Sequence, residues 1–150
     1  MGRRRLAREI ALQALYIADV AHTPGLEAFA IVTRRRGEEL DGETLDFARE
    51  LTLGALDRVE ALDKLIADQA ANWSMTRMAA VDRNVLRLAA FELTARPDTP
   101  VGVVIDEAIE IVRKYSTEEA TRFINGILDS LKKLRDEKPS QKKNARKKEP

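Results

Sequence analysis

Four arginines lie within the first eight residues of the chain: Arg3, Arg4, Arg5 and Arg8. A guanidinium group stays charged at physiological pH, and its planar fork of N–H donors matches the oxygens of a phosphate. At the start of a helix these cations oppose the helix dipole, which costs roughly a few tenths of a kcal/mol. A purely structural role would not favour this place, so the cluster favours a polyanion ligand such as RNA. The residues leave open a plainer alternative, a solvated helix end with one Arg5–Glu9 pair.

Side chains that could do catalysis or hold a metal are scarce. The chain has no cysteine, a single histidine (His22, in a predicted turn) and no glycine-rich phosphate loop. Its carboxylate pairs Asp106-Glu107 and Glu118-Glu119 are adjacent in sequence, so their side chains diverge on a helix and fit solvated surface charge. We therefore expect no enzyme, no cofactor and no metal site. The lack of cysteine also excludes disulfides and is typical of the reducing cytosol.

Charge is distributed unevenly along the 150 residues, although the formal net charge is only +1. Both ends are basic, and residues 9–135 between them are acidic. Such segregation suggests a polyanion that is bound at particular places. With 44% hydrophobic residues the chain can bury a core, and no apolar run approaches the roughly 20 residues needed to span a bilayer. We expect a cytoplasmic protein of one domain that does not enter a membrane.

Helical spacing of the apolar residues predicts an all-α fold of about seven helices. The first three are expected over 3–21, 24–36 and 43–71. The first is apolar around most of its girth and should lie centrally, with Glu9, Gln13 and Tyr16 on a narrow wet side. The third is expected to run unbroken, because Gly54 is its single unfavourable residue.

The second half is expected to hold a short turn at 75–79 and helices over 82–95, from Pro100 onward, and over 117–135. The helix over 82–95 is again apolar almost all round, which places it at the centre of this half. Thr99 is the predicted N-cap of the helix that follows, and Ser116 with Glu119 forms a capping-box pattern before the last helix. Gly126 lies within that last helix, where glycine costs about 1 kcal/mol relative to alanine, and it suggests a close helix contact.

The helices fall into two groups on either side of Trp73, which is expected to pack as a wedge between them. We expect one domain over 1–135, with sub-bundles at about 3–71 and 75–135. The basic tail over 136–150 has almost no apolar residues, so it is expected to be disordered and to attract RNA only weakly.

Three separated blocks of this sequence resemble the NusB family. They are RRRLAREIALQALY at 3–16, VDRNVLRLAAFEL at 81–93, and the segments 105–111, 114–117 and 123–129. The resemblance covers roughly residues 3–135 and implies two small helical bundles packed together. It also implies a function: binding the boxA element of nascent RNA together with NusE, a ribosomal protein. The antitermination complex so formed keeps RNA polymerase reading through terminators, notably in ribosomal RNA operons.

The resemblance also implies roles for residues outside the arginine cluster. Phe123 lies beside Arg122 in a region that meets RNA in the family, and single-stranded RNA stacks its bases on aromatic rings. Arg122 and Arg83 are candidates to extend the basic track, and Asp82 is a candidate to contact the protein partner. Plainer alternatives stay open, with Phe123 in the core and Asp82 as a helix cap. Tyr16 is expected to pack its ring in the core.

Two other classes of protein fit parts of this pattern. One is the NusB-like RNA-recognition domain of ribosomal RNA cytosine methyltransferases, although 150 residues leave no room for a domain that binds the methyl donor. The other is a helical dimerisation protein, because some family members pair with themselves and hide the RNA surface by doing so. The resemblance leaves a homodimer open beside an RNA-binding adaptor.

Overall fold

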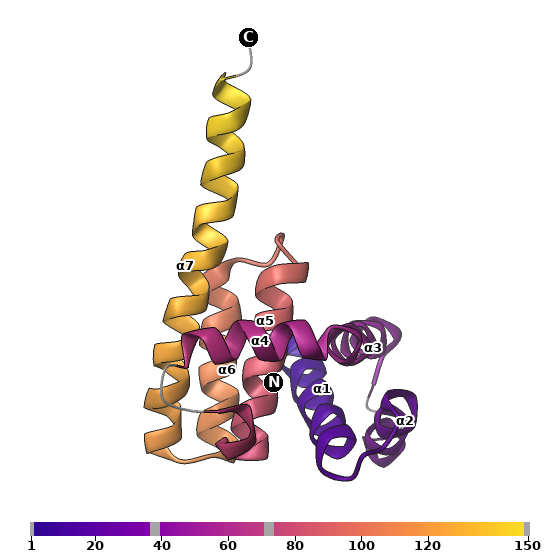
Figure 1. Ribbon diagram of the computed structural model, residues 1–150. Helices are drawn as coiled ribbons and strands as arrows, with labels where there is room; N and C mark the ends of the chain where they lie inside the picture. Colours follow the sequence, from indigo (N-terminus) through magenta and orange to yellow (C-terminus); the bar gives the residue numbers. More distant parts are fainter. Residues whose placement is uncertain (1, 37–39, 71–73, 149–150) are drawn as a thin grey trace.

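The computed structural model describes residues 2–36, 40–70 and 74–148, with side chains described to residue 133 and at Arg135. Over these residues the chain forms seven α-helices, one short 3-10 turn and no strand, which confirms the predicted all-α class (Figure 1). The elements are α1 (Arg3–Val20), α2 (Gly25–Arg36), α3 (Gly42–Asp57), α4 (Val59–Gln69), η2 (Met75–Arg77), α5 (Ala80–Ala95), α6 (Val101–Tyr115) and α7 (Glu118–Lys148).

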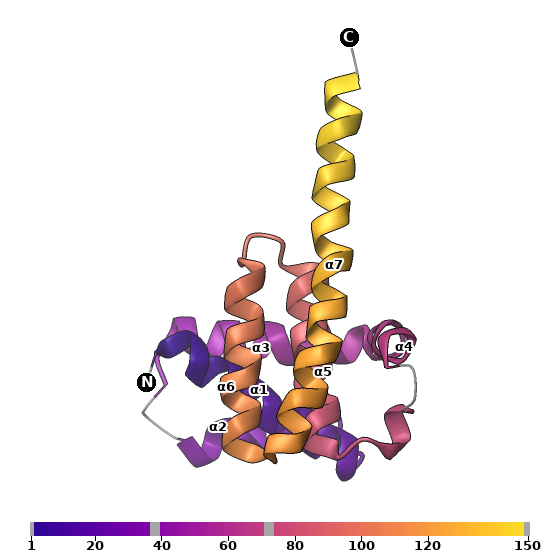
Figure 2. The same ribbon diagram turned by 90° about the vertical axis from the view of Figure 1, so that its left-hand side faces the viewer.

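The helices pack in two groups that meet at α1 and α5 (Figure 1, Figure 2). In one group α1 packs against α2 and α3, and in the other α5 packs against α4, α6 and α7. Both α1 and α5 bury side chains around most of their circumference, so the central position predicted for each is confirmed. Their contact joins the two groups into one hydrophobic core.

The predicted single helix over 43–71 is wrong, because the chain leaves helical geometry at Arg58 (φ −115°, ψ 17°). The break separates α3 from α4 and lets each pack against a different set of helices. α3 packs against α1, α2 and α5, whereas α4 packs against α5 and α7. No proline or glycine marks residues 55–60, so tertiary packing and not local propensity sets this break.

The close helix contact lies at Gly54 and not at Gly126. A Cβ added at Gly54 would lie 2.3 Å from Cζ of Phe91, so only a glycine lets α3 approach the ring on α5 this closely. Nothing lies within 4 Å of a Cβ added at Gly126. The contact predicted for Gly126 is therefore wrong.

The helix starts differ slightly from the predicted caps. α6 begins at Val101 with Pro100 in the N-cap position and no side-chain cap, so the predicted cap at Thr99 is wrong. At α7, Thr117 Oγ1 accepts a hydrogen bond from the Ala120 amide at 3.0 Å, which places the cap one residue after Ser116. The β-branched run at the start of α6 is helical, because the spacing of its buried residues outweighs strand propensity.

α7 continues to Lys148, beyond its predicted end at 135, and projects past the other helices (Figure 1, Figure 2). Side chains over 136–148 lie outside the described residues, so disorder of the tail 136–150 stays a prediction. Trp73 and its predicted wedge also lie outside them. Over the described residues, no helix combines the length and apolar character that a membrane span requires.

Candidate nucleic-acid interface

Arg8 points into the protein, away from the other arginines of the N-terminal cluster. The residue is 3% exposed, and its guanidinium donates two hydrogen bonds to the Glu92 carboxylate, at 2.7 and 2.8 Å. The pair joins α1 to α5 across the centre of the molecule. Glu9 is also buried and pairs with Lys114 at 2.7 Å, so its predicted place on a wet side is wrong. The surface cluster is therefore smaller than the sequence suggests.

Arg3, Arg4 and Arg5 lie at the surface, each in a different contact. The Arg3 side chain is 75% exposed and lies 3.3 Å from Asp41. Arg4 stacks over the ring of Phe47, with 4.2 Å between its Cζ and the ring centroid. Arg5 is half-buried against α6. The predicted Arg5–Glu9 pair does not form, since both residues bond to α6 instead.

Arg5 donates two hydrogen bonds to the Glu107 carboxylate on α6, at 2.7 and 3.1 Å. The hydrogen bond to Glu107 raises the pKa of Arg5 above its ordinary value. In return, the hydrogen bond from Arg5 lowers the pKa of Glu107 against the opposing effect of burial. The pair fixes the direction of the guanidinium but leaves part of it in solvent.

Phe47 is a platform that sequence reasoning missed. Three guanidinium groups lie over its ring, those of Arg4, Arg8 and Arg96, at 4.2, 5.5 and 4.9 Å from the centroid. Arg96 also pairs with Glu50. Cation–π contacts of this kind hold guanidinium groups in place through the ring quadrupole. No spacing rule links residues 4, 47 and 96, so the sequence gives no signal for this cluster.

A shallow depression of about 700 Å³ lies between the start of α1, α6 and the start of α7. Its lining includes three arginines (Arg5, Arg113 and Arg122), three carboxylates (Asp106, Glu107 and Glu110) and the apolar side chains of Ile105 and Ile109. We call it the basic depression. Arg113 pairs with Glu110 at 3.0 Å, whereas exposed Arg122 has no ion pair with any described residue. The structure thus brings two predicted arginines, Arg5 and Arg122, to one place.

A second depression, of about 370 Å³, lies between the starts of α5 and α7. Its lining includes Asp82, Phe123, Thr117, Glu119 and Arg77, and we call it the α5–α7 pocket. Phe123 is half-buried and packs against the core. Asp82 makes no capping hydrogen bond, so the cap alternative for this residue is wrong. Because consecutive Arg122 and Phe123 line different depressions, the first turns of α7 form the ridge between them.

Arg83 lies apart from both depressions, within a polar network between the two groups of helices. It donates to Asp19 at 2.8 Å and to the carbonyls of Met75 and Met78 at 3.0 and 3.2 Å. Burial alone would raise the pKa of Asp19, but the hydrogen bonds from Arg83 and Asn84 outweigh it and lower that pKa. Arg83 therefore fastens η2 and α1 to α5, and the structure does not bring it into the basic track.

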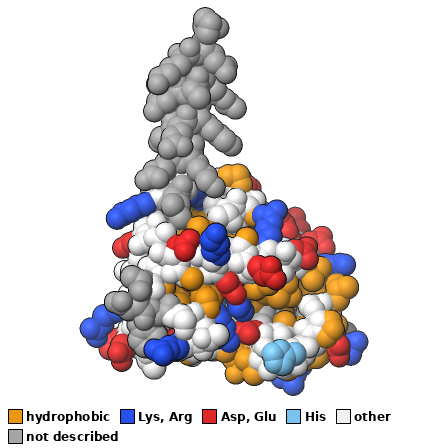
Figure 3. Space-filling model, in the orientation of Figure 1, with side chains coloured by type: hydrophobic (Ala, Val, Ile, Leu, Met, Phe, Trp, Pro, Cys, Tyr) orange, Lys and Arg blue, Asp and Glu red, His pale blue; other side chains and the backbone are white. Residues whose placement is uncertain are grey.

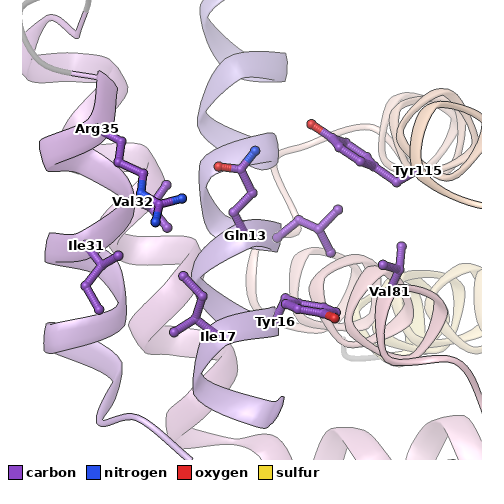
Figure 4. A pocket seen from close by; sticks show the side chains of 9 residues that line it. Gln13, Tyr16, Ile17, Ile31, Val32, Arg35, Val81 and Tyr115 are labelled. Atoms are coloured by element: carbon purple, nitrogen blue, oxygen red, sulfur yellow. The ribbon is translucent and has the colours of Figure 1, made fainter. Parts of the chain in front are cut away.

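An apolar groove of about 360 Å³ runs between α1 and α2 and reaches α5 and α6 (Figure 4). Ile17, Ile31 and Val32 line it, and Val81 lies at its α5 side. Tyr16 also lines the groove and is 40% exposed, so its predicted place in the core is wrong. Figure 3 shows other apolar side chains lying exposed between charged ones over one face of the molecule.

The NusB family model matches residues 5–133 of the chain. The transcription antitermination protein NusB of Elusimicrobium minutum is 48% identical over 136 residues, which cover 90% of this chain and 96% of that protein. The transcription antitermination protein NusB of Geotalea daltonii is 44% identical, with 87% of this chain and 94% of that protein covered.

Solved structures of NusB proteins have the same fold. NusB of T. maritima superposes with a TM-score of 0.81 at 36% identity, covering 87% of this chain and 90% of that one. A chain from the crystal structure of antitermination factors NusB and NusE in complex with double-stranded RNA superposes with a TM-score of 0.81 at 29% identity. The match covers 88% of this chain and 97% of that chain.

Proposed function

This chain belongs to the NusB family, and we propose that it is a cytoplasmic transcription antitermination factor that binds boxA RNA together with NusE. By this proposal it supports elongation by RNA polymerase on nascent transcripts, notably those of ribosomal RNA operons. One observation carries the proposal: a NusB structure that shares this fold was solved in complex with NusE and RNA. We propose a binding protein and not an enzyme.

We propose that the RNA backbone follows the basic depression. Arg122 is exposed and without an ion pair among the described residues, so it can bind a phosphate without first losing a carboxylate partner. Arg5 faces the same depression with its guanidinium already oriented by Glu107. Arg3 and Arg4 add exposed cations at the start of α1. Arg8 and Arg83 are left out of this surface because both are committed to internal carboxylates.

We propose that NusE covers the apolar groove between α1 and α2. Apolar grooves with tyrosines that remain half-exposed are typical of protein interfaces, because such rings bury a large area while keeping a polar tip. Val81 lines the groove and Asp82, the next residue, lines the α5–α7 pocket. The apolar groove and the α5–α7 pocket therefore adjoin at the start of α5. A second copy of this chain is the alternative occupant of the groove.

Fluorescence anisotropy with labelled boxA RNA and a scrambled RNA of the same composition tests this function. We expect boxA RNA to bind more tightly than the scrambled RNA, and more tightly still when NusE is present. Equal binding of the two RNAs by the chain, alone and with NusE, would remove the proposal. A chain that remains dimeric in light scattering at saturating RNA and NusE would favour the dimerisation protein.

Arg122→Ala tests the placement of the RNA. Each lost phosphate contact flattens the dependence of log affinity on log salt by about 0.7 for single-stranded RNA. Arg49→Ala is the matched control, because Arg49 is an exposed helical arginine that lines none of the three depressions. We expect the slope to flatten in Arg122→Ala alone. An equal slope in both variants and the parent chain would move the RNA away from the basic depression.

A further inference from the structure

The apolar groove between α1 and α2 has one charged residue among the described residues that line it, Arg35. The rest of this lining is apolar or uncharged and includes no carboxylate. Arg35 lies in the last turn of α2, is exposed, and has no ion pair with any described residue. The groove therefore combines an apolar floor with a single cation that no acid of its own lining neutralises.

A second donor lies beside this cation. Figure 4 shows the side chains of Arg35 and Gln13 extending toward one another from α2 and α1, whereas Ile17 and Ile31 lie further along the groove. The amide of Gln13 can turn its N–H donors toward the point at which the guanidinium aims. One end of the groove thus offers hydrogen-bond donors and positive charge, and the other end offers apolar surface.

A protein that covers the groove has to satisfy Arg35. Covering removes water from the guanidinium, and a charged group that loses its water without gaining an acceptor is costly. A carboxylate is the best replacement, because its two oxygens accept both prongs of the guanidinium fork and balance its charge. The groove therefore fits an apolar segment of chain that carries one carboxylate.

A second copy of this chain matches the groove less well. In a two-fold dimer the same patch lies on both sides of the interface, so Arg35 would face a lining that contains no carboxylate. Glu27 is the single acid of α2, and it does not line the groove. The charge of Arg35 therefore favours a different protein as the occupant.

We propose that Arg35 is a specificity residue for NusE, and that it pairs with one carboxylate of NusE whose apolar neighbours fill the groove. Gln13 donates a hydrogen bond to the same carboxylate. This inference rests on the proposed function, in which NusE covers the groove, and adds the chemistry by which the groove selects its occupant. The recognised segment contains an aspartate or glutamate beside apolar residues.

Isothermal titration of the full chain with NusE tests this pairing at about 0.15 M salt, where exposed charges are screened over about 8 Å. Arg35→Ala should weaken NusE binding by about tenfold or more, and Arg35→Glu by about a hundredfold or more because like charges then oppose each other. Arg34→Glu is the matched control and should stay within about threefold of the parent chain. Arg34 is an exposed arginine in the same helical turn, and it does not line the groove.

A charge reversal in NusE identifies the carboxylate. Each exposed aspartate and glutamate of NusE is replaced in turn by lysine and titrated against the parent chain and against Arg35→Glu. We expect one replacement that weakens binding to the parent chain and restores binding to Arg35→Glu to within about tenfold of the original affinity. If no replacement restores binding, Arg35 does not pair with an acid of NusE and the inference is wrong.

Circular dichroism during heating shows whether each variant is folded. Unchanged NusE binding by Arg35→Glu, with weakened binding by Tyr16→Ala, would overturn the inference and leave NusE on the groove. Retained NusE binding by Arg35→Glu with loss of boxA RNA affinity in the absence of NusE would assign Arg35 to RNA. Self-association that is lost in Arg35→Glu and restored by adding Glu27→Arg, measured by light scattering, would assign the groove to a second copy; either result overturns the inference. A parent chain that does not bind NusE would instead remove NusE from the proposed function, and the inference with it.

Discussion

The arginines of the first helix have the same chemistry but different surroundings, and the surroundings decide what each can do. Arg8 is enclosed between α1 and α5, where Glu92 uses both prongs of its guanidinium fork. Arg5 makes the same bidentate contact at the surface, with Glu107, and remains partly in solvent. A buried pair is maintained by the absence of competing water, whereas a surface pair exchanges readily with a phosphate. A structural role and a proposed ligand-binding role therefore lie within two turns of one helix.

Arg8→Ala should be strongly destabilising, because it leaves the Glu92 carboxylate buried at 1% exposure without a partner. Breaking a buried pair on one side typically costs about 3–5 kcal/mol. Urea denaturation followed by circular dichroism measures the loss. Arg3→Ala is the control and should change stability by less than about 1 kcal/mol, since its contacts are exposed. Equal stability of the two variants would mean that the buried pair does not hold α1 to α5.

The lowered pKa of Asp19 makes the free energy of unfolding depend on pH. Its pKa in the folded protein is lowered from an ordinary value of 3.8, so the folded state binds its proton less readily than the unfolded chain does. The stability it contributes is present above about pH 4 and is lost as the pH falls through the folded pKa. Unfolding free energies measured between pH 3 and 6 should therefore fall less steeply in Asp19→Asn than in the parent chain. Parallel curves would show that Asp19 is not coupled to Arg83 and Asn84.

At the scale of helices, periodicity in the sequence located nearly every element, because each helix buries one stripe or more. The break at Arg58 could not be predicted this way, since residues 43–71 keep one apolar stripe while the helices packed against it change from α1, α2 and α5 before the break to α5 and α7 after it. The predicted exposure of charged residues was wrong for a similar reason, because their partners come from distant parts of the chain. Glu9 is read as solvated from its type, yet its partner Lys114 lies 105 residues away in sequence. A contact between residues so far apart in sequence cannot be recognised from the periodic spacing of residue types.

Gly54 and Gly126 allow a matched test of helix packing. Gly54→Ala should destabilise the protein by about 1–3 kcal/mol or more, because the added methyl group overlaps the Phe91 ring and forces α3 away from α5. Gly126→Ala places the same methyl group in open space within α7 and should stabilise by up to about 1 kcal/mol through helix propensity. Thermal unfolding compares the two. A stabilising Gly54→Ala would contradict the close approach of α3 to α5.

At the scale of the whole molecule, three surfaces surround the place where α1, α5, α6 and α7 meet. The sequence predicted that Arg5 and Arg122 belong together, and the basic depression contains both. It did not predict the apolar groove, because Tyr16 and Tyr115 come from helices whose relative rotation only packing determines. Nor did it predict the α5–α7 pocket, which forms only where the starts of α5 and α7 lie side by side. Sequence patterns predict single helices, but they do not predict a binding surface that several helices form together.

The adjacency of these surfaces predicts that the RNA and NusE sites are coupled. Tyr16→Ala removes a ring from the groove that NusE is proposed to cover, so it should weaken NusE binding by about tenfold or more, as loss of an interface aromatic typically does. The affinity for boxA RNA should then be unchanged without NusE and reduced in its presence. Arg122→Ala should show the opposite pattern, with weaker RNA binding in both conditions. Because linkage is reciprocal, RNA must raise the affinity for NusE by the same factor by which NusE raises the affinity for RNA. Isothermal titration of each ligand with and without the other measures both factors in the parent chain, and a Tyr16→Ala protein that loses RNA affinity even without NusE would mean that the groove belongs to the RNA.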